Sequence, residues 1–391
     1  MVKPLRIGVV AGEASGDLLG AALIEALTEK LPAVEFIGLA GEQMRAAGCE
    51  PLGSSEELAV MGLVEPLRHL PRLLRLRARL LRIFQERRID VFIGIDSPAF
   101  NIGLALRMRR RGCITVQYVS PQVWAWRRGR VQKIAAAVDA VLCLLPFEPA
   151  AYEDQPVRAE FVGHPLADQI PLNADRQAAR QALGIADDVC VVAVLPGSRL
   201  GEVGRLGADF VAATRQLREL VTGPLHFVAP LASVRVGAVF RQQVHAAGAQ
   251  IQLVEQRAHE VFAAADAALV TSGTATLQAL LYGCPMVVAY RFAPITAFIA
   301  RDLGLMKVRN FSLPNLLAEE TLVPEFFQRG VTPVALAAAL RETLLDTSRR
   351  EYLRQRFRLI HLQLRQGGAT RAAQVVMDLL ASRYGTASGS A

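Results

Sequence analysis

The sequence VVAVLPGSR (Val191–Arg199) is a short apolar strand that runs directly into a turn of small residues, and AALVTSGTAT (Ala267–Thr276) repeats this arrangement later in the chain. Small residues let backbone N–H groups approach a phosphate, and the N-terminus of the helix that follows adds roughly half a positive charge there. One such turn is weak evidence, because many of them only connect elements in α/β proteins. Two in one half of the chain predict a nucleotide diphosphate site, with six residues expected to bind it: Gly197, Ser198, Arg199, Ser272, Gly273 and Thr274.

The second turn lies inside a complete βαβ unit. After Thr274 the helix Leu277–Tyr282 ends at Gly283-Cys284-Pro285, and the strand Met286–Tyr290 follows. The same alternation of strand and helix runs through both halves of the chain, which is typical of α/β folding. The predicted strands are Arg6–Ala11, Val34–Leu39, Val91–Ile95, Thr115–Val119, Ala140–Leu144, Phe161–Leu166, Cys190–Leu195, His226–Ala229, Ile251–Val254, Ala267–Val270 and Met286–Tyr290.

A length of 391 residues favours two domains, and a hydrophobic content of 52% is ample for two cores. We place the boundary after Gly163-His164-Pro165-Leu166, which predicts an N-terminal Rossmann-like domain over 1–166 and a C-terminal Rossmann-like domain over 167–345. Residues 346–391 are predicted as helices that cap the second domain or cross back to the first, with a frayed tail from Gly385.

The net charge of +8 does not by itself indicate nucleic-acid binding. Of the 44 basic residues 40 are arginine, a bias that genome composition alone can produce, and aromatic residues make up only 6% of the chain, too few for a stacking groove. The five cysteines form no C-x-x-C pair, so neither a zinc site nor a disulfide framework is predicted, which fits a reducing cytoplasm. The N-terminus leads into a strand without a signal segment, and no run reaches the roughly 18 apolar residues of a membrane span.

The first turn, Gly12–Gly20, resembles a dinucleotide loop but lacks the G-x-G-x-x-G spacing. The second strand also ends at Gly38-Leu39-Ala40-Gly41 without an acidic residue for a ribose hydroxyl, which argues against hydride transfer. The turn still presents backbone amides and polar side chains at the carboxyl edge of a sheet, where doubly wound folds bind ligands. Glu13, Ser15 and Gly16 are therefore predicted acceptor-binding residues, while Ser15 and Asp17 have the alternative of capping a helix.

The strand Val91–Ile95 delivers Asp96 to the same edge. A carboxylate placed there can serve as the base that activates a sugar hydroxyl, and the alternative is a helix or turn cap. Asn101 follows in the same segment, and Trp124 lies in a later loop, 118–127, which holds both tryptophans of the chain. Asn101 and Trp124 are both predicted acceptor-binding residues. For Trp124 the reason is that two tryptophans in one loop more often line a pocket than pack in a core.

Together these segments resemble the lipid-A-disaccharide synthase family, glycosyltransferases of the GT-B type with two Rossmann-like domains facing one cleft. The resemblance covers nearly the whole chain. It rests on Gly12–Gly20, Ala59-Val60-Met61-Gly62, Gly94-Ile95-Asp96, Tyr118–Trp126, Leu145-Pro146-Phe147-Glu148, Gly163-His164-Pro165, Leu195–Arg199, Ser272–Leu277 and Ser312-Leu313-Pro314-Asn315-Leu316-Leu317.

The resemblance implies an inverting transfer without a metal or other cofactor. The donor would be UDP-2,3-diacylglucosamine and the acceptor 2,3-diacylglucosamine 1-phosphate, whose 6-hydroxyl attacks the anomeric carbon to give a β-1,6-linked disaccharide and UDP. Asp96 would be the catalytic base, and Arg199 with the two helix N-termini would stabilise the departing diphosphate. Asn315 is expected to contact a substrate and is grouped with the donor-binding residues, whereas Glu202 and His164 have equally good structural explanations, a helix-start acid and a hinge residue.

Two positions depart from the family pattern. Gln278 stands where an acidic residue usually follows, and an amide can still hydrogen-bond to ribose hydroxyls, so it is kept as a donor-binding residue. Ala99 stands where a second aspartate is common, which leaves Asp96 as the sole carboxylate expected in its loop.

Both implied substrates carry acyl chains, so the enzyme is expected to work at the cytoplasmic face of the inner membrane without spanning it. The segment Leu67–Phe84 fits that task, because five arginines form one helical stripe and leucines cover most of the remainder. The predicted membrane contacts are Leu70, Leu73, Leu74, Leu76, Leu80 and Leu81. The alternative is an ordinary amphipathic helix with buried leucines, and the family resemblance also implies a homodimer formed by exchange of C-terminal elements.

Two other functions compete with the glycosyltransferase. A UDP-sugar 2-epimerase of similar two-domain build would need neither an acceptor nor a membrane. A nucleotide-binding module without catalysis would leave Asp96 and the tryptophan loop without a purpose.

Overall fold

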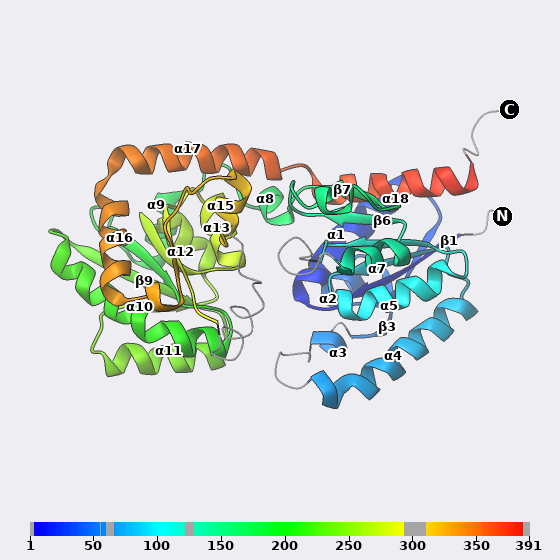
Figure 1. Cartoon of the computed structure of the whole chain (residues 1–391), viewed down its shortest axis with the longest axis horizontal. Helices are drawn as coiled ribbons and strands as arrows, with labels where there is room; N and C mark the ends of the chain where they lie inside the picture. Colours follow the sequence, from blue (N-terminus) through cyan, green and yellow to red (C-terminus); the bar gives the residue numbers. More distant parts are fainter. Residues whose placement is uncertain (1–3, 55, 60–65, 122–128, 293–309, 386–391) are drawn as a thin grey trace. The chain divides into compact units, whose positions relative to one another are not determined.

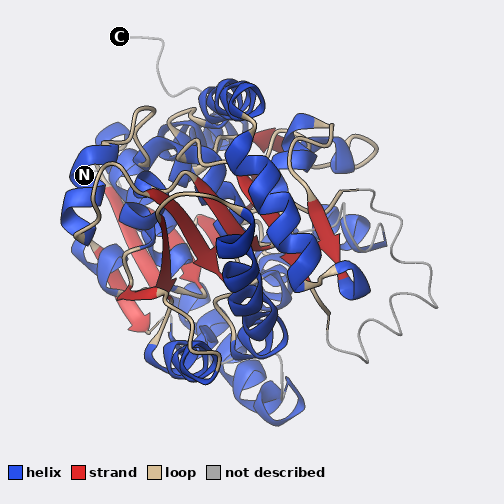
Figure 2. Ribbon diagram, turned by 90° about the vertical axis from the view of Figure 1, so that its left-hand side faces the viewer, coloured by secondary structure: helices blue, strands red, loops and turns tan. Residues whose placement is uncertain are grey.

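The computed structural model describes residues 4–54, 56–59, 66–121, 129–292 and 310–385 (Figure 1). The chain forms two compact units, of which unit 1 comprises Met1–Asp168 with Leu364–Ala391 and unit 2 comprises Gln169–Gln363. Each unit contains one parallel sheet between helices, and the strands are drawn in red in Figure 2. Two α/β domains with parallel sheets confirm the fold class predicted from the alternating pattern.

The sheet of unit 1 has the strand order β3-β2-β1-β4-β5-β6-β7, and every pair is parallel. The order reverses between β1 and β4, so these neighbours form the topological switch point, where open α/β sheets bind ligands beyond the carboxyl ends of the strands. The strands are β1 (Leu5–Ala11), β2 (Val34–Leu39), β3 (Cys49–Gly53), β4 (Val91–Ile95), β5 (Ile114–Tyr118), β6 (Ala140–Cys143) and β7 (Arg158–Phe161).

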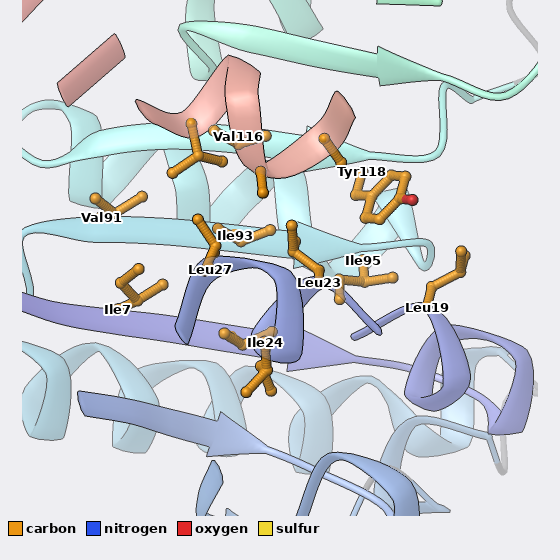
Figure 3. Close-up of a cluster of buried hydrophobic side chains, with 14 of the residues drawn as sticks. Ile7, Leu19, Leu23, Ile24, Leu27, Val91, Ile93, Ile95, Val116 and Tyr118 are labelled. Carbon is orange, nitrogen blue, oxygen red and sulfur yellow. The ribbon is translucent and has the colours of Figure 1, made fainter. Parts of the chain in front are cut away.

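The helices of unit 1 cover both faces of this sheet because the strand residues alternate between two apolar cores. On one face Ile7, Ile93 and Val116 pack under Leu23 and Leu27 of α1 (Figure 3). Phe92 points to the other face, into a core formed with α4, α5 and α7. The helices are α1 (Ala14–Lys30), α2 (Glu42–Ala46), α3 (Glu56–Ala59), α4 (Pro66–Glu86), α5 (Pro98–Arg109), α7 (Gly129–Ala137), the short 3-10 helix Pro149–Tyr152 and α18 (Gly368–Tyr384).

The C-terminal helix α18 belongs to unit 1 although it is distant in sequence. Ala372, Ala373, Val375 and Val376 are buried in the core that α1 also covers. Asp168 accepts hydrogen bonds from the backbone N–H groups of Gly367 (3.0 Å) and Gly368 (2.7 Å), which satisfies donors at the start of α18. The chain therefore crosses back to its first unit at the end.

The sheet of unit 2 repeats the same topology with six parallel strands in the order β10-β9-β8-β11-β12-β13. Its switch point lies between β8 and β11, where Leu195 is in register with Val270. The strands are β8 (Cys190–Leu195), β9 (Leu225–Leu231), β10 (Gln252–Glu255), β11 (Ala267–Thr271), β12 (Met286–Tyr290) and β13 (Glu325–Phe327). Helix α8 (Pro165–Gln169) lies almost wholly in unit 1, which ends at Asp168. The helices of unit 2 are α9 (Arg176–Leu183), α10 (Leu200–Leu220), α11 (Val234–Ala246), α12 (Ala258–Ala264), α13 (Thr274–Leu281), α15 (Leu313–Ala318), the 3-10 turn Gln328–Gly330, α16 (Pro333–Leu345) and α17 (Thr347–Leu364).

Three details differ from the predicted elements. The edge strands β3 and β13 were not predicted, because both are short and carry Glu at a strand position. The segment Phe161–Leu166 was predicted as a strand that ends in a turn, and the strand, β7, already ends at Phe161, since Gly163 adopts a positive φ of 100° and Pro165 opens α8. No helix in the described residues is long and apolar enough to cross a membrane.

Candidate functional site

In unit 1 the turns after β1 and β4 lie side by side at the switch point. Ala11 and Ile95 are in register, and a Cβ atom at Gly12 would meet the Ser97 hydroxyl, so the glycine allows the two turns to lie against each other. Glu13 and Ser15 are exposed at this edge, whereas Gly16 is buried beside Ala11 and Ile95. The structure therefore leaves the side chains of Glu13 and Ser15 accessible to a ligand and packs Gly16 against the sheet.

Asp96 follows directly at the end of β4 and is half-buried. Its backbone adopts a left-handed conformation (φ 51°), as does that of Ser97 (φ 41°), and its N–H donates to the carbonyl oxygen of Tyr118 at 2.9 Å. Within the described residues its carboxylate accepts no hydrogen bond. Non-glycine residues in this conformation cluster at functional sites, and an unengaged carboxylate can accept a proton from a bound hydroxyl.

Asn101, which was predicted to bind the acceptor, has a fully buried side chain whose amide is directed at the backbone of the Asp96 turn. Its Nδ2 donates to the carbonyl oxygens of Asp96 (2.9 Å), Ile95 (3.2 Å) and Val10 (3.3 Å). Asn101 therefore fastens the Asp96 turn from below. Gln117 does the same from β5, and the sequence did carry a signal for it, a polar residue within an otherwise apolar buried strand.

Asp17 caps a helix other than the one on which it lies. Its carboxylate accepts from the backbone N–H groups of Gly41 (2.7 Å), Gln43 (2.9 Å) and Met44 (3.3 Å) at the start of α2. This explains why the side chain is buried, and it follows the structural alternative given for Asp17.

In unit 2 the backbone amides of the turn after β8 bind a carboxylate of the same chain, that of Glu202. Glu202 Oε2 accepts from the backbone N–H of Ser198 (3.1 Å) and of Arg199 (3.3 Å). Gly197 has a φ of 134°, and a Cβ there would lie 2.5 Å from that of Glu202, so the turn requires glycine. The Arg199 side chain is 70% exposed, with one loose ion pair of 3.5 Å to Glu202. The geometry thus gathers two amides and a guanidinium around one carboxylate.

The turn after β11 lies next to it, on the neighbouring strand. Gly273 (φ 148°) and Thr274 are exposed at the start of α13, and the Thr276 hydroxyl donates back to the Gly273 carbonyl at 2.7 Å. Ser272 uses its hydroxyl to hold the carbonyl oxygen of Phe311 (3.1 Å). Gln278 is half-buried one turn further along, and its side-chain amide makes no hydrogen bond in the part of the chain that the structure describes.

Asn315 does not offer its side chain to a ligand, which corrects the prediction. It is fully buried, its Nδ2 donates to the Val323 carbonyl (2.9 Å) and to Glu325 (2.8 Å), and its Oδ1 accepts from the N–H groups of Leu322 (2.8 Å) and Val323 (2.9 Å). Every donor and acceptor of the amide is used, so Asn315 ties α15 to the segment that leads into β13.

Glu148 and His164 are titratable groups of unit 1 whose pKa values are shifted by burial. Burial lowers the pKa of His164 to about 4, and its Nδ1 accepts from the Leu166 N–H at 3.2 Å. The backbone N–H of His164 donates to the Leu364 carbonyl (2.9 Å). This bond holds the segment before α8 against the end of α17. Burial raises the pKa of Glu148 to about 7 although the N–H groups of Leu145 and Leu144 stabilise its carboxylate.

The helix α4 buries most of the leucines that were predicted to contact a membrane. Leu73, Leu76 and Leu80 are in the core under the sheet, and Leu81 packs partly against it. Among the predicted leucines whose side chains the structure describes, Leu74 alone is exposed, at 49%. The expected outward orientation of the buried leucines was wrong because one face of α4 packs against α5 and the sheet. The side chain of Leu70 and the whole of Trp124 lie outside the described residues.

The arginine stripe of α4 does face outward. Arg72, Arg75, Arg79 and Arg82 are exposed, while the side chain of Arg68 lies outside the described part. Arg77 is off the stripe and turns inward, where its guanidinium lies 5.1 Å from the centre of the Phe100 ring and donates to the Ala99 carbonyl.

Comparisons with known proteins agree on one family. A sequence model described as lipid-A-disaccharide synthetase matches residues 7–379. The chain is 50% identical to the lipid-A-disaccharide synthase of Azotobacter vinelandii over 97% of its own length and 99% of that protein, and 45% identical to that of Xylella fastidiosa strain 9a5c over 98% and 100%.

Solved structures with low sequence identity share the fold. A UDP-N-acetylglucosamine 2-epimerase from Listeria monocytogenes, described as putative, superposes with a TM-score of 0.64 at 14% identity, covering 98% of this chain and 97% of that one. The calicheamicin glycosyltransferase gives a TM-score of 0.58 at 18% identity, with 98% and 100% covered.

Proposed function

This chain belongs to the lipid-A-disaccharide synthetase family and is a glycosyltransferase, and on that premise we propose its substrates and the residues that act on them. The donor is UDP-2,3-diacylglucosamine and the acceptor is 2,3-diacylglucosamine 1-phosphate. The products are UDP and the β-1,6-linked disaccharide 1-phosphate. The observation that carries the proposal is the matched topology, in which the polar turns follow β1 and β4 in one sheet and β8 and β11 in the other, at both switch points.

Asp96 acts as the base in this scheme. It takes the proton of the acceptor 6-hydroxyl as the oxygen attacks the anomeric carbon of the donor. The bond between that carbon and the diphosphate oxygen breaks, and its electron pair leaves with UDP. Attack from the face opposite the leaving group inverts the anomeric centre. The half-buried, unengaged carboxylate at the switch point supports this role.

The diphosphate binds at the turns Pro196–Arg199 and Ser272–Thr274 of unit 2. The Glu202 carboxylate supports this placement, because an oxyanion already accepts from the amides of Ser198 and Arg199, and a phosphate oxygen can take its place. The exposed Arg199 guanidinium offers a planar fork to the phosphate oxygens. Gln278 is placed to hydrogen-bond to the ribose hydroxyls.

Product analysis tests the function directly. Purified protein with UDP-2,3-diacylglucosamine should release UDP only when the lipid acceptor is present. Interconversion of the UDP-sugar without acceptor would instead establish the epimerase, for which the distant structural neighbours support the fold alone. Under the proposal EDTA leaves turnover unchanged. If EDTA inactivates the enzyme and magnesium restores it, a metal and not Arg199 stabilises the departing UDP.

The substrates also place the enzyme at the cytoplasmic surface of the inner membrane. The exposed arginines of α4 and the exposed Leu74 supply cationic groups and one apolar anchor for an anionic lipid surface. In this proposal the membrane contact is mainly electrostatic, because Leu73, Leu76 and Leu80 belong to the core.

A further inference from the structure

Two buried side-chain amides converge on the backbone that carries Asp96. Asn101 Nδ2 and Gln117 Nε2 donate to the Asp96 carbonyl oxygen at 2.9 and 3.1 Å. Both residues are 0% exposed. In the described residues this carbonyl accepts from these two side chains alone, so the turn has no backbone partner at that point.

Gln117 also joins this turn to the next one. Its Nε2 lies 3.2 Å from the carbonyl oxygen of Tyr118 and 3.3 Å from that of Val119, so three carbonyl oxygens from two turns share one NH₂ group. Three carbonyl dipoles pointing at one place repel each other unless a donor lies between them. The Asp96 carbonyl also accepts from Asn101 and the Tyr118 carbonyl from the Asp96 N–H, so an apolar side chain of the same size would remove the shared donor and leave the Val119 carbonyl without a partner in the described residues.

The backbone around this amide is held in an unfavourable conformation. Asp96 and Ser97 have positive φ, and so does Val119 (φ 74°), which as a β-branched residue is a rare occupant of that region. Such conformations persist only where the surroundings over-determine them. Asn101 secures the Asp96 turn from its own segment, but Gln117 is the group that ties it to Val119 across the sheet.

We propose that Gln117 is a positioning residue of the transferase reaction, which holds the Asp96 turn so that the carboxylate meets the acceptor hydroxyl. The inference rests on the proposed role of Asp96 as the base. Gln117 touches no substrate and acts through the backbone of Asp96. A misplacement of about 1 Å in a reacting group can cost roughly 100-fold in rate, so the amide affects turnover and not donor binding, which is assigned to unit 2.

The test compares Gln117→Met, Gln117→Glu and Thr115→Val. Methionine keeps the volume and removes the donor, so kcat should fall by about 10- to 100-fold while the donor KM and UDP affinity stay within about threefold. Thr115 lies on the same face of β5, is equally buried and donates to Asp139 and Ala137 away from the Asp96 turn. Thr115→Val therefore controls for general damage to β5, and its kcat should remain near that of the wild type.

Gln117→Glu gives a signature that mere destabilisation does not produce. An ionised carboxylate repels the three carbonyl oxygens, whereas a protonated carboxyl can donate one hydrogen bond to them. Its kcat should therefore rise as the pH falls, while the wild-type rate falls when its base becomes protonated. Because this compares one protein with itself, it also decides the case if Gln117→Met does not fold.

Three outcomes overturn the inference. A wild-type kcat in Gln117→Met together with an inactive Asp96→Asn refutes the role of Gln117 and leaves that of Asp96 intact. A Gln117→Glu profile that follows the wild-type slope excludes a donor function. Normal turnover of Asp96→Asn excludes Asp96 as the base, and the positioning role of Gln117 is then excluded as well.

Discussion

At the turn after β8, the amides of Ser198 and Arg199 bind the carboxylate of Glu202, the third residue of α10. From the sequence this glutamate had two equally good explanations, a functional acid or a helix-start acid, and the structure shows the second. The same contact demonstrates that the turn accepts an oxyanion. Under the proposed function, UDP competes with this internal carboxylate, and the outcome depends on groups that Glu202 does not fully engage. Arg199 is such a group, since most of its side chain is exposed.

Replacing Arg199 with lysine should weaken the stabilisation of the departing UDP. Lysine keeps the charge but loses the fork, so we expect a loss of about 1.5–3 kcal/mol in transition-state stabilisation, measured as the ratio of kcat/KM values. Arg218→Lys is a matched control, because the Arg218 guanidinium lies over the Phe227 ring in the same unit. An unchanged kcat/KM for Arg199→Lys would assign the diphosphate to other groups.

Asp96→Asn should lower turnover by at least about 100-fold, because the amide cannot accept a proton, and general base catalysis is typically worth 10²–10⁴-fold. UDP affinity, measured by calorimetry, should not change, since the donor turns belong to unit 2. Asp17→Asn, which alters a buried cap of α2, controls for structural damage in the same unit. Near-normal turnover of Asp96→Asn would exclude Asp96 as the base.

At the scale of elements, α4 separates a core face from a charged face. Leu80 is fully buried while Leu74, on the same helix, is 49% exposed. The width of the apolar arc in the sequence predicted a second, outward apolar face, but a periodic pattern does not say where neighbouring elements will lie. The buried side chains of α4, Leu73, Leu76, Leu80 and Phe84, are three or four residues apart and form a single stripe that faces the core.

The helix predicts two opposite results for leucine substitutions. Leu74→Ser should leave the free energy of unfolding within about 0.5 kcal/mol and weaken binding to anionic vesicles. Leu80→Ala should cost about 2–5 kcal/mol of stability, because it opens a cavity in the core. Vesicle co-sedimentation alongside urea unfolding checks both, and a large loss of stability in Leu74→Ser would show that this side chain is also core.

The arginines of α4 give an independent test of membrane docking. Arg72→Gln with Arg75→Gln should weaken binding to anionic vesicles by about 1 kcal/mol per residue, an effect that salt should diminish. The control pair Arg110→Gln with Arg235→Gln removes the same charge from exposed positions elsewhere. Equal losses in both pairs would mean that net charge, and not α4, attracts the protein to lipid.

At the scale of the whole molecule, the sequence predicted two α/β domains and the turns at both switch points, because apolar strands and small-residue turns are local signals. It did not predict what depends on distant partners. Asn101 and Asn315 occur in polar turn motifs like those of ligand contacts, and only their burial and saturated or inward-facing amides show them to be structural. The edge strands β3 and β13 were not predicted for a related reason, since an edge strand needs less apolar content than a central one.

The shifted pKa values of Glu148 and His164 predict how the stability of unit 1 depends on pH. Glu148 has a folded-state pKa of about 7 against an ordinary 4.5, so between these values the folded state retains a proton that the unfolded state releases. The free energy of unfolding therefore decreases as the pH rises through this window. His164 has a folded-state pKa of about 4 against 6.5, so here the unfolded state takes up a proton first, and stability decreases as the pH falls from about 6.5 to 4.

Since the two effects oppose each other between about pH 4.5 and 6.5, each should become visible when the other group is removed. Glu148→Gln keeps an oxygen for the amides of Leu144 and Leu145 but cannot ionise. Its stability relative to the wild type should rise with pH across about 4.5 to 7, by about 3 kcal/mol at most.

For His164→Asn the free energy of unfolding relative to the wild type should increase as the pH falls below about 6.5. Urea unfolding followed by tryptophan fluorescence reports on unit 1, because both tryptophans of the chain, Trp124 and Trp126, belong to it. A stability difference that does not change with pH in either variant would mean that the corresponding group titrates alike in the folded and unfolded chain.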